Sequence, residues 1–485
     1  MLMRVRDVGL FVQNLWTRMP FRYGIATLTA VPHLLVRVEL DIDGQVSAGL
    51  AADNLPPKWF TKNAERSTDD ELLELLEVVG RAAAHATAAA EMPSVFDLWR
   101  QVYAAQRQWG EAAGLPALLW AFGVTLIERA VIDAFCRHAG LTFHEAVHGN
   151  ALGLRVGEIH PELADAQPCD LLPPRPLRQL IVRHTVGLAD PLTADDIPDD
   201  QRLADGLPHA LADCIDAYGL THFKIKVPAD PDVAVDRLTR VAAVITDRCP
   251  QFACTLDGNE FFHDVGDFRR LWERLAATPA LRTLLGPALL FVEQPLHRDV
   301  ALADATAREL RSWPDAPRMI IDESDGTLAA ARQALDLGYR GTSHKNCKGV
   351  FKGLANACLL AARHAQGFTG ILSGEDLTNV GPVALMQDLA VLATLGIPSA
   401  ERNGHHYFAG LSGWPEPVQR ATQHAHPDLY QPHETPAGPT WPALHIDRGI
   451  LALGSVVAAP FGYAMNLDPA AFTPADQWRV ESLHV

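Results

Sequence analysis

Short apolar segments that lead into a charged residue recur along the middle of this chain. The segments are Phe223 to Val227, Phe252 to Leu256, Ala288 to Val292 and Met319 to Ile321, and the last three lead directly into Asp257, Glu293 and Asp322. Each has the length of a buried parallel strand, and the intervals hold helical patterns such as Val233 to Val244. Strands that alternate with helices in this way predict a βα barrel with its chemistry at the carboxyl ends of the strands.

Lysines bracket these acids in the sequence. Lys224 and Lys226 are two residues apart, a spacing that puts both side chains on the same face of a strand. Two ammonium groups in one small space are unfavourable unless anions lie opposite them. A further lysine, Lys345, follows the segment Gly341 to His344 at the same kind of position. We therefore expect the lysines and the acids to share one site.

The order of these motifs resembles the enolase superfamily. Lys-x-Lys, Asp-x-Asn, Glu-Gln-Pro, Asp-Glu-Ser and Lys follow one another between Lys224 and Lys345. Within the superfamily the match is to the muconate lactonising enzyme-like subgroup of the mandelate racemase/muconate lactonising enzyme family, which has a lysine at the ends of the second and sixth barrel strands. The resemblance implies a (β/α)7β modified TIM barrel with an α+β capping domain.

The resemblance also implies a division of the chain. We expect residues 1–174 to form the N-terminal part of the cap, residues 175–430 the catalytic barrel, and residues 431–485 a segment that returns to the cap. Pro168 to Pro176 contains four prolines and is the candidate linker. The proline-rich stretch Gln431 to Pro442 is expected to be extended.

Local patterns place the elements more closely. The Asp43-Gly44 pair predicts a hairpin turn, and helices are expected over Asp69 to Ala90 and Leu115 to Ala139. In the second helix, Asp133 is expected to form a structural salt bridge. The first barrel strand is expected over Leu177 to Leu188. The other strands should end near Lys226, Asp257, Glu293, Glu323, Lys345 and Ser373, with the last over Ile397 to Asn403.

Three carboxylates from neighbouring strand ends suit a hard cation that prefers oxygen ligands. Asp257, Glu293 and Asp322 are therefore the expected ligands of Mg²⁺, with Mn²⁺ as the alternative metal. Asn259 and Glu323 stand beside these ligands and are expected to orient them. The competing interpretation is an acidic rim that simply pairs with lysine and arginine.

The resemblance implies that the metal binds a substrate carboxylate while a lysine removes the α-proton, giving an enediolate intermediate. Lys226 is the expected base on one face of the substrate, and Lys345 acts on the other. Lys224 is expected to lie near the substrate carboxylate and, with the metal, to lower the pKa of Lys226. The Gly-Gly pair that the family usually has a few residues after this lysine is missing after Lys345. Lys348 is therefore the alternative catalytic lysine if the register of the sixth strand is shifted.

The reaction class remains open at this point. A racemase or epimerase with two lysines is the favoured function. The same residues would also serve a lyase or cycloisomerase, such as an o-succinylbenzoate synthase-like dehydration or a lactonisation. A non-catalytic binding scaffold is the third reading. The mandelate racemase-like subgroup is disfavoured, because the seventh strand offers no histidine and the sixth no aspartate. The pair His405-His406 is expected to be exposed in a loop.

Substrate choice is expected to come from the cap. Two stretches, Met19 to Gly24 and Ala52 to Trp59, are predicted to be irregular loops over the barrel mouth, with Phe21, Tyr23 and Trp59 as a lid. Arg22, Trp59 and Lys348 are the candidate substrate-binding residues. Arg18, Arg22 and Lys58 could meet a second anionic group. The alternative is that the aromatic residues pack within the cap's own core.

Composition limits the partners. The 485 residues carry a net charge of −17, which argues against nucleic acid or an anionic membrane. The seven cysteines form no Cys-x-x-Cys pair, so we expect neither disulfides nor a zinc site. With no membrane-spanning run or secretory signal apparent, a cytoplasmic protein is expected. The partner is expected to be a small-molecule carboxylate, and the resemblance implies a homo-oligomer.

Overall fold

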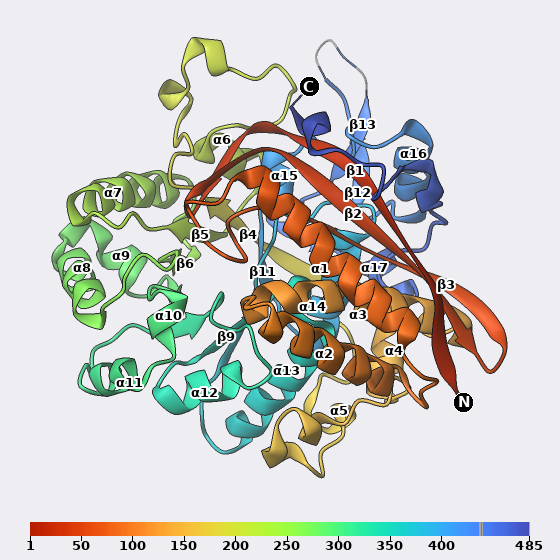
Figure 1. Ribbon diagram of the computed structural model, residues 1–485. Coiled ribbons are helices and arrows are strands. Elements are labelled where there is room, and N and C mark those ends of the chain that lie inside the picture. The colour runs from red at the N-terminus through yellow and green to blue at the C-terminus, as the bar shows by residue number, and fades with distance from the viewer. Residues whose placement is uncertain (436–437, 439, 485) are drawn as a thin grey trace.

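The computed structural model describes residues 1–435, 438 and 440–484 of the chain. Figure 1 shows a ring of strands surrounded by helices, with a long antiparallel sheet and further helices lying across one side of it. The first part of the chain supplies this sheet and these helices. The two bodies correspond to the predicted barrel and cap.

Eight parallel strands form the barrel. They are β4 (Gln179–Val186), β5 (His222–Lys226), β6 (Ala253–Asp257), β7 (Leu289–Glu293), β8 (Met319–Ile321), β9 (Gly341–His344), β10 (Ile371–Gly374) and β11 (Ser399–Arg402). Each strand pairs with the next in parallel, and β11 pairs with β4, which closes the ring. The predicted βα barrel is therefore confirmed.

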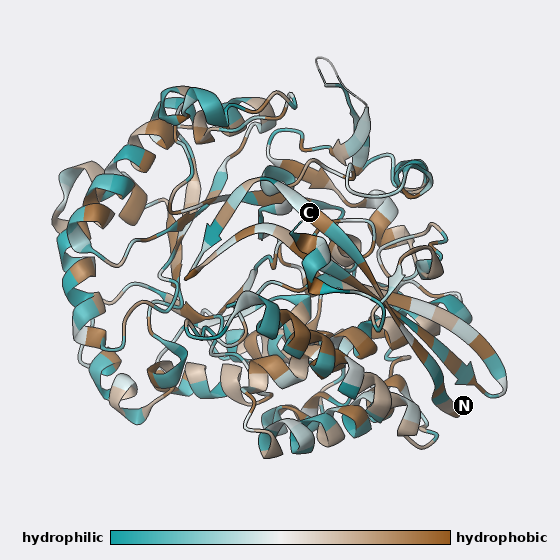
Figure 2. Cartoon of the chain, turned by 45° about the horizontal axis from the view of Figure 1, so that its top comes forward, coloured by the Kyte–Doolittle hydropathy of each residue, from teal (hydrophilic) through white to brown (hydrophobic). Residues whose placement is uncertain are grey.

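Amphipathic helices surround the strands. The longer ones are α6 (Leu211–Tyr218), α7 (Pro231–Arg248), α8 (Val265–Ala277), α11 (Asp304–Arg311), α12 (Ala330–Leu337), α13 (Val350–Ala365) and α14 (Ala384–Leu395). In α7, the side chain of Asp230 accepts hydrogen bonds from the first backbone amides, while Leu238, Val241 and Ile245 are buried. Figure 2 shows hydrophilic and hydrophobic residues alternating along these outer helices.

The cap is built on a four-stranded antiparallel sheet. Its order is β15 (Thr473–Pro474), β1 (Met3–Tyr23), β2 (Ala26–Ile42) and β3 (Gln45–Asn54). The predicted turn at Asp43-Gly44 joins β2 to β3, and both residues have positive φ. The prediction that Met19 to Gly24 is an irregular loop is wrong. β1 continues to Tyr23, which pairs with Ala26, so a short turn separates the two strands.

Three helices pack on this sheet: α1 (Thr68–Ala88), α2 (Val95–Ala112) and α3 (Ala117–Ala139). The first and third were predicted, but α2 was not. It begins after Ser94, whose hydroxyl accepts a hydrogen bond from the amide of Asp97. In α3, Asp133 pairs with Arg137 at 3.0 Å and accepts a hydrogen bond from the amide of Leu50, which confirms its structural role.

The remaining helices are short, except for α16 (Glu416–Ala425). The short ones are α4 (Phe143–His148), α5 (Pro168–Leu171), α9 (Arg282–Leu285), α10 (Arg298–Ala301), α15 (Gly404–Tyr407) and α17 (Gly454–Ala458). Within the predicted linker, α5 forms one helical turn that starts at Pro168.

The C-terminal segment contacts both bodies. β14 (Ile450–Ala452) pairs with barrel strand β4, whereas β15 pairs with β1 of the cap. β12 (Tyr430–His433) and β13 (Trp441–Leu444) form a hairpin at the two ends of the stretch that was expected to be extended. Residues 436, 437 and 439 of that stretch lie outside the described residues. The proposed boundaries at 174 and 430 stay a prediction.

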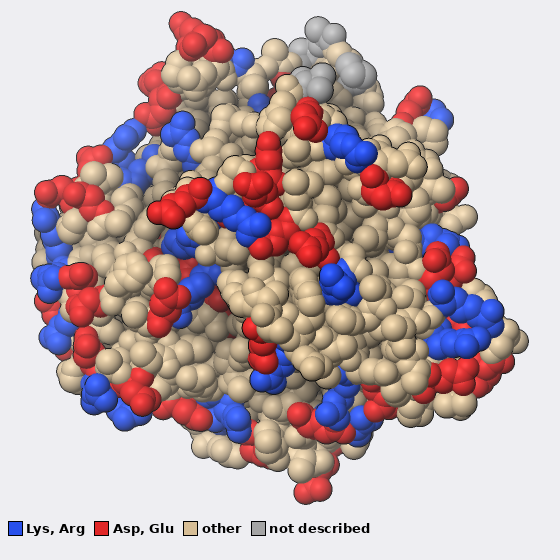
Figure 3. All heavy atoms as spheres, in the orientation of Figure 1, with Lys and Arg blue, Asp and Glu red and all other residues tan. Residues whose placement is uncertain are grey.

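The surface mixes charges of both signs. On the face drawn in Figure 3, acidic side chains lie beside lysines and arginines, with broad uncharged areas between these groups. No helix in the described part of the chain is long and apolar enough to cross a lipid bilayer.

Candidate active site

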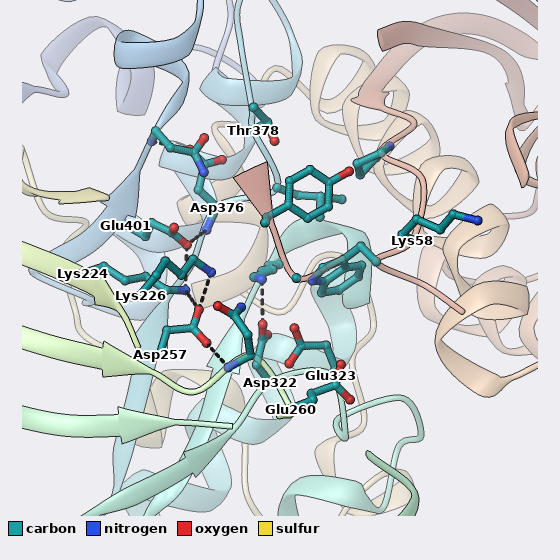
Figure 4. Close-up of a pocket in the computed structure, with 18 of the residues that line it drawn as sticks. Lys58, Lys224, Lys226, Asp257, Glu260, Asp322, Glu323, Asp376, Thr378 and Glu401 are labelled. Carbon is teal, nitrogen blue, oxygen red and sulfur yellow. Dashed lines mark hydrogen bonds and ion pairs between the residues drawn. The ribbon is translucent and has the colours of Figure 1, made fainter. Parts of the chain in front are cut away.

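A cavity of about 580 Å³ lies where the carboxyl ends of the barrel strands meet the cap (Figure 4). The barrel contributes Lys224, Lys226, Asp257, Asn259, Glu260, Arg298, Asp322, Glu323, Lys345, Asp376, Leu377, Thr378, Glu401 and Asn403. The cap contributes Phe21, Tyr23, Gly24, Pro56, Lys58, Trp59 and Lys62.

The two lysines of β5 have different surroundings. The ammonium of Lys224 is buried among four carboxylates, at 3.1 Å from Asp257, 2.7 Å from Glu293, 2.8 Å from Glu375 and 3.0 Å from Glu401. Burial alone would lower the pKa of Lys224, but these carboxylates outweigh it and raise that pKa well above its ordinary value. Lys226 lies two residues further along the strand and contacts Asp257 at 2.5 Å.

The three predicted metal ligands converge from neighbouring strand ends. Asp257 and Glu293 are directly opposite in the register of β6 and β7, and Asp322 follows β8. Burial, together with the negative charges of Glu375, Asp257 and Asp322, raises the pKa of Glu293 well above its usual range. Asp257 and Asp322 line the cavity, whereas Glu293 is buried beside Lys224.

Lys345, of the two alternatives, is the lysine that lines the cavity. Its ammonium is 2.7 Å from Asp322 and 4.6 Å from the centre of the Trp59 ring. Lys348 is buried on the other side of Asp322, at 3.1 Å, and donates to Ser343. Burial opposes the charge of Asp322, but both lysines outweigh this and hold its pKa well below the usual range. Lys348 is therefore not among the residues that line the cavity.

Asn259 and Glu323 line the cavity beside the acids, as their positions in the sequence suggested. The backbone amide of Asn259 donates to Oδ1 of Asp257 at 2.9 Å. The side-chain Oδ1 of Asn259 is buried and has no hydrogen-bond partner among the described residues. Burial and the charges of Asp322 and Glu260 raise the pKa of Glu323 to about 8.

The sequence analysis missed several charged residues of this site. Glu375 follows β10 and Glu401 lies on β11, and both contact Lys224. Glu260 pairs with Arg298, whose guanidinium also donates to the carbonyls of Trp59 and Phe60 in the cap. The rule that found the other acids, a charged residue at a strand end, could have found Glu375 and Glu401 too.

The cap residues fulfil only part of the expectation. Phe21, Tyr23 and Trp59 line the cavity, but Arg22 is exposed and is not among the lining residues. The prediction of Arg22 as a substrate-binding residue is therefore not supported by its position. It lies on β1, where alternate side chains point to opposite faces, so its neighbours Phe21 and Tyr23 face the cavity instead.

Two other cap cations are already paired. Arg18 binds both carboxylate oxygens of Asp205, and its side chain is almost fully buried. Lys58 donates to backbone carbonyls and to Glu71 at 3.2 Å, and Figure 4 shows it directed away from the acids. A second anionic group of a substrate would have to compete with these partners.

The expectation that His405 and His406 form an exposed pair is wrong. Both lie on α15, just after β11, and are 7% and 2% exposed. They pack against His184 of β4, because closure of the barrel brings the first and last strands together.

The residues present fit a divalent cation. Asp257, Glu293 and Asp322 offer oxygen atoms only, as Mg²⁺ prefers. Oδ1 of Asn259 is buried and has no hydrogen-bond partner among the described residues. Buried oxygens that lack hydrogen bonds are expected where a further cation or water belongs.

No protein-family model and no curated protein matches this chain. Solved structures do match. Muconate lactonizing enzyme from Pseudomonas fluorescens, complexed with muconolactone, has a TM-score of 0.58 at 17% identity over 97% of this chain and 99% of that chain. 2-Chloromuconate cycloisomerase from Rhodococcus opacus 1CP has a TM-score of 0.57 at 18% identity over 98% and 100%. N-succinyl Arg/Lys racemase from Bacillus cereus has a TM-score of 0.55 at 16% identity over 94% and 97%. At such identities the likeness establishes the fold: a barrel and cap arranged as in mandelate racemase/muconate lactonizing enzymes.

Proposed function

We propose that this chain, which has the fold of the mandelate racemase/muconate lactonizing enzymes, is an enolase-superfamily enzyme that removes a proton α to a substrate carboxylate. The reaction we favour is racemisation or epimerisation with two lysines. The observation that carries the proposal is that Lys226 and Lys345 line one cavity from β5 and β9. These strands are four apart in a closed ring of eight, so they stand on opposite sides of the barrel mouth.

Asp257, Glu293 and Asp322 would hold the metal, Mg²⁺ or Mn²⁺. When bound, the metal would neutralise the negative charge that develops on the substrate carboxylate as the α-proton leaves. The acids Asp257 and Asp322 also pair with Lys224, Lys226, Lys345 and Lys348. Lys224 would keep the carboxylates of β6, β7, β10 and β11 together.

Lys226 and Lys345 would move the proton. The Nζ of one lysine removes it from one face of the α-carbon, and the Nζ of the other returns it to the opposite face. General acid–base catalysis by such a group contributes on the order of 10²–10⁴-fold. The Trp59 ring, Phe21 and Tyr23 would exclude water from above, which strengthens the electrostatic interactions below them.

Cycloisomerisation is the second candidate, because two of the similar structures are titled muconate lactonizing enzyme and 2-chloromuconate cycloisomerase. It and a lyase reaction would use the same residues. A non-catalytic scaffold is less consistent with the acids and lysines that converge on one cavity. A homo-oligomer stays a prediction.

The test is exchange of the substrate's α-proton in D₂O with Mg²⁺, across a panel of amino-acid, dipeptide and hydroxy-acid carboxylates. Exchange reports the half-reaction even when the final product is unknown. We expect at least one carboxylate to exchange, and the Lys226→Ala, Lys345→Ala double variant to lose that exchange. Exchange by the double variant at the wild-type rate would contradict the proposal, and turnover without any exchange would point away from proton abstraction.

A further inference from the structure

A second cluster of metal-ligating side chains lies apart from the carboxylates, where the first and last barrel strands meet. His184 is on β4, Cys214 is on α6, and His406 is on α15 just after β11. One ligand atom of each lies within 4.8 Å of the others, and all three residues are buried. The sequence analysis expected no zinc site, because these residues are far apart in the chain and form no Cys-x-x-Cys motif.

One distance within the cluster suits a tetrahedral ion, and the ligand atom of His184 lies within 4.8 Å of the other two. Sγ of Cys214 lies 3.6 Å from Nδ1 of His406. A Zn²⁺ ion with a Zn–S bond of about 2.3 Å and a Zn–N bond of about 2.0–2.1 Å separates two tetrahedral ligands of these kinds by about 3.6 Å. The thiol and the imidazole are therefore already at the spacing that shared coordination would require.

A third histidine supports the cluster from outside. Nε2 of His405 lies 3.0 Å from Nδ1 of His184, which orients that ring. Histidine ligands of metals usually have their second nitrogen held by such a partner. His405 is itself buried, and its Nδ1 has no hydrogen-bond partner.

Coordination would use one ring nitrogen of each imidazole and the thiolate of Cys214. A metal ion would displace the thiol proton, which is released to solvent as the thiolate binds.

We propose that His184, Cys214 and His406 supply three ligands of one Zn²⁺ ion, with His405 as a positioning residue. The site is separate from the carboxylate cluster and does not depend on the proposed reaction. His184 is paired in register with Arg402 of β11, so the ion would join the two strands that close the barrel. It would also brace the cap, because Tyr407, next to His406, stacks on Phe21 at 4.1 Å between ring centres.

The experiment uses the full chain, stripped of metal with a chelator and then held in excess Mg²⁺ to saturate the oxygen-ligand site. Zn²⁺ is titrated against a chromophoric competitor, and Co²⁺ is added separately as a spectroscopic probe. We expect one tight Zn²⁺ equivalent, a higher Tm with Zn²⁺, and a thiolate-to-cobalt charge-transfer band. Cys214→Ser should lose the band, and His405→Gln should weaken Zn²⁺ binding by about 10–100-fold.

Cys358→Ser is the matched control, because Cys358 is also a buried free cysteine but lies on α13. It should keep the band and the Zn²⁺ equivalent. The proposal is overturned if the wild type shows no charge-transfer band, or if Cys214→Ser keeps it. Wild-type protein alone decides the first outcome, so the test stands even if a variant fails to fold.

Discussion

On the β5 side and on the β9 side of the barrel mouth, two lysines contact one aspartate. We call Lys226 and Lys345 the front lysines and Lys224 and Lys348 the rear lysines. The two rear lysines have different partners. On the β5 side, Lys226 lines the cavity and contacts Asp257. Lys224 lies deeper and contacts carboxylates that come from four strands, β6, β7, β10 and β11. One ammonium thus contacts acids from half of the ring.

On the β9 side the contacts are local. Lys345 lines the cavity, against Asp322 and beneath Trp59. Lys348 contacts Asp322, which directly follows β8, and Ser343, which lies on β9. Lys226 and Lys345 therefore occupy equivalent positions on the two sides. Of the two rear lysines, only Lys224 holds together carboxylates from several strands.

The largest expected effect on activity comes from the loss of a proposed metal ligand on either side of the barrel mouth. Asp257→Asn and Asp322→Asn each remove a proposed metal ligand, and each should lower α-proton exchange by on the order of 10³-fold or more, because a metal supplies several kcal/mol of charge stabilisation. Chelation with EDTA should have the same effect, reversed by Mg²⁺. Asp267→Asn, an exposed residue of α8, is the control. Full activity after exhaustive EDTA treatment would remove the metal from the proposal.

The front lysines should divide the reaction between the two faces of the substrate. Lys226→Ala and Lys345→Ala should each reduce exchange from one enantiomer by about 10²–10⁴-fold, because each removes one proton carrier. The readout is NMR exchange measured separately for each enantiomer. Should Lys345→Ala exchange both enantiomers normally while Lys348→Ala loses one, the assignment of the β9 side would be wrong.

Substitution of the two rear lysines should lower the free energy of unfolding by different amounts. Lys224→Met leaves buried carboxylates without their shared cation, and breaking a buried charge network of this kind costs about 3–5 kcal/mol. Lys348→Met should cost less, because Lys345 still neutralises Asp322 at 2.7 Å. Urea denaturation of both variants gives the free energies of unfolding. A greater loss in Lys348→Met would reverse the comparison.

The smallest expected effect comes from Trp59→Leu, and it should affect only the proton exchange on the β9 side of the barrel mouth. Trp59→Leu removes the ring that lies 4.6 Å from the Lys345 ammonium, and a contact of this kind is worth about 0.5–2 kcal/mol. We expect a several-fold change in kcat/KM ratios among substrates, with the exchange through Lys345 affected and that through Lys226 unchanged. Trp16→Leu, at an exposed tryptophan of β1, is the control. Lost stability with unchanged selectivity would assign Trp59 to the core of the cap.

The sequence alone determined what depends on short-range periodicity. The period of two in a strand put Lys224 and Lys226 on one face, and the strand-end rule located Asp257, Glu293 and Asp322. Apolar runs of strand length alternating with helices predicted the barrel. These features are local, because each is set by residues within a few positions of one another along the chain.

Tertiary structure decided what depends on contacts between distant segments. The turn after β9 put Lys345 at the cavity and Lys348 behind Asp322, which the run of lysines could not show. Closure of the ring between β11 and β4 buried the histidines that were expected to be exposed, and it brought Glu401 to Lys224. The physical reason is that a side chain's burial and partners depend on how whole elements pack, and local periodicity carries no information about the element that arrives from the other end of the chain.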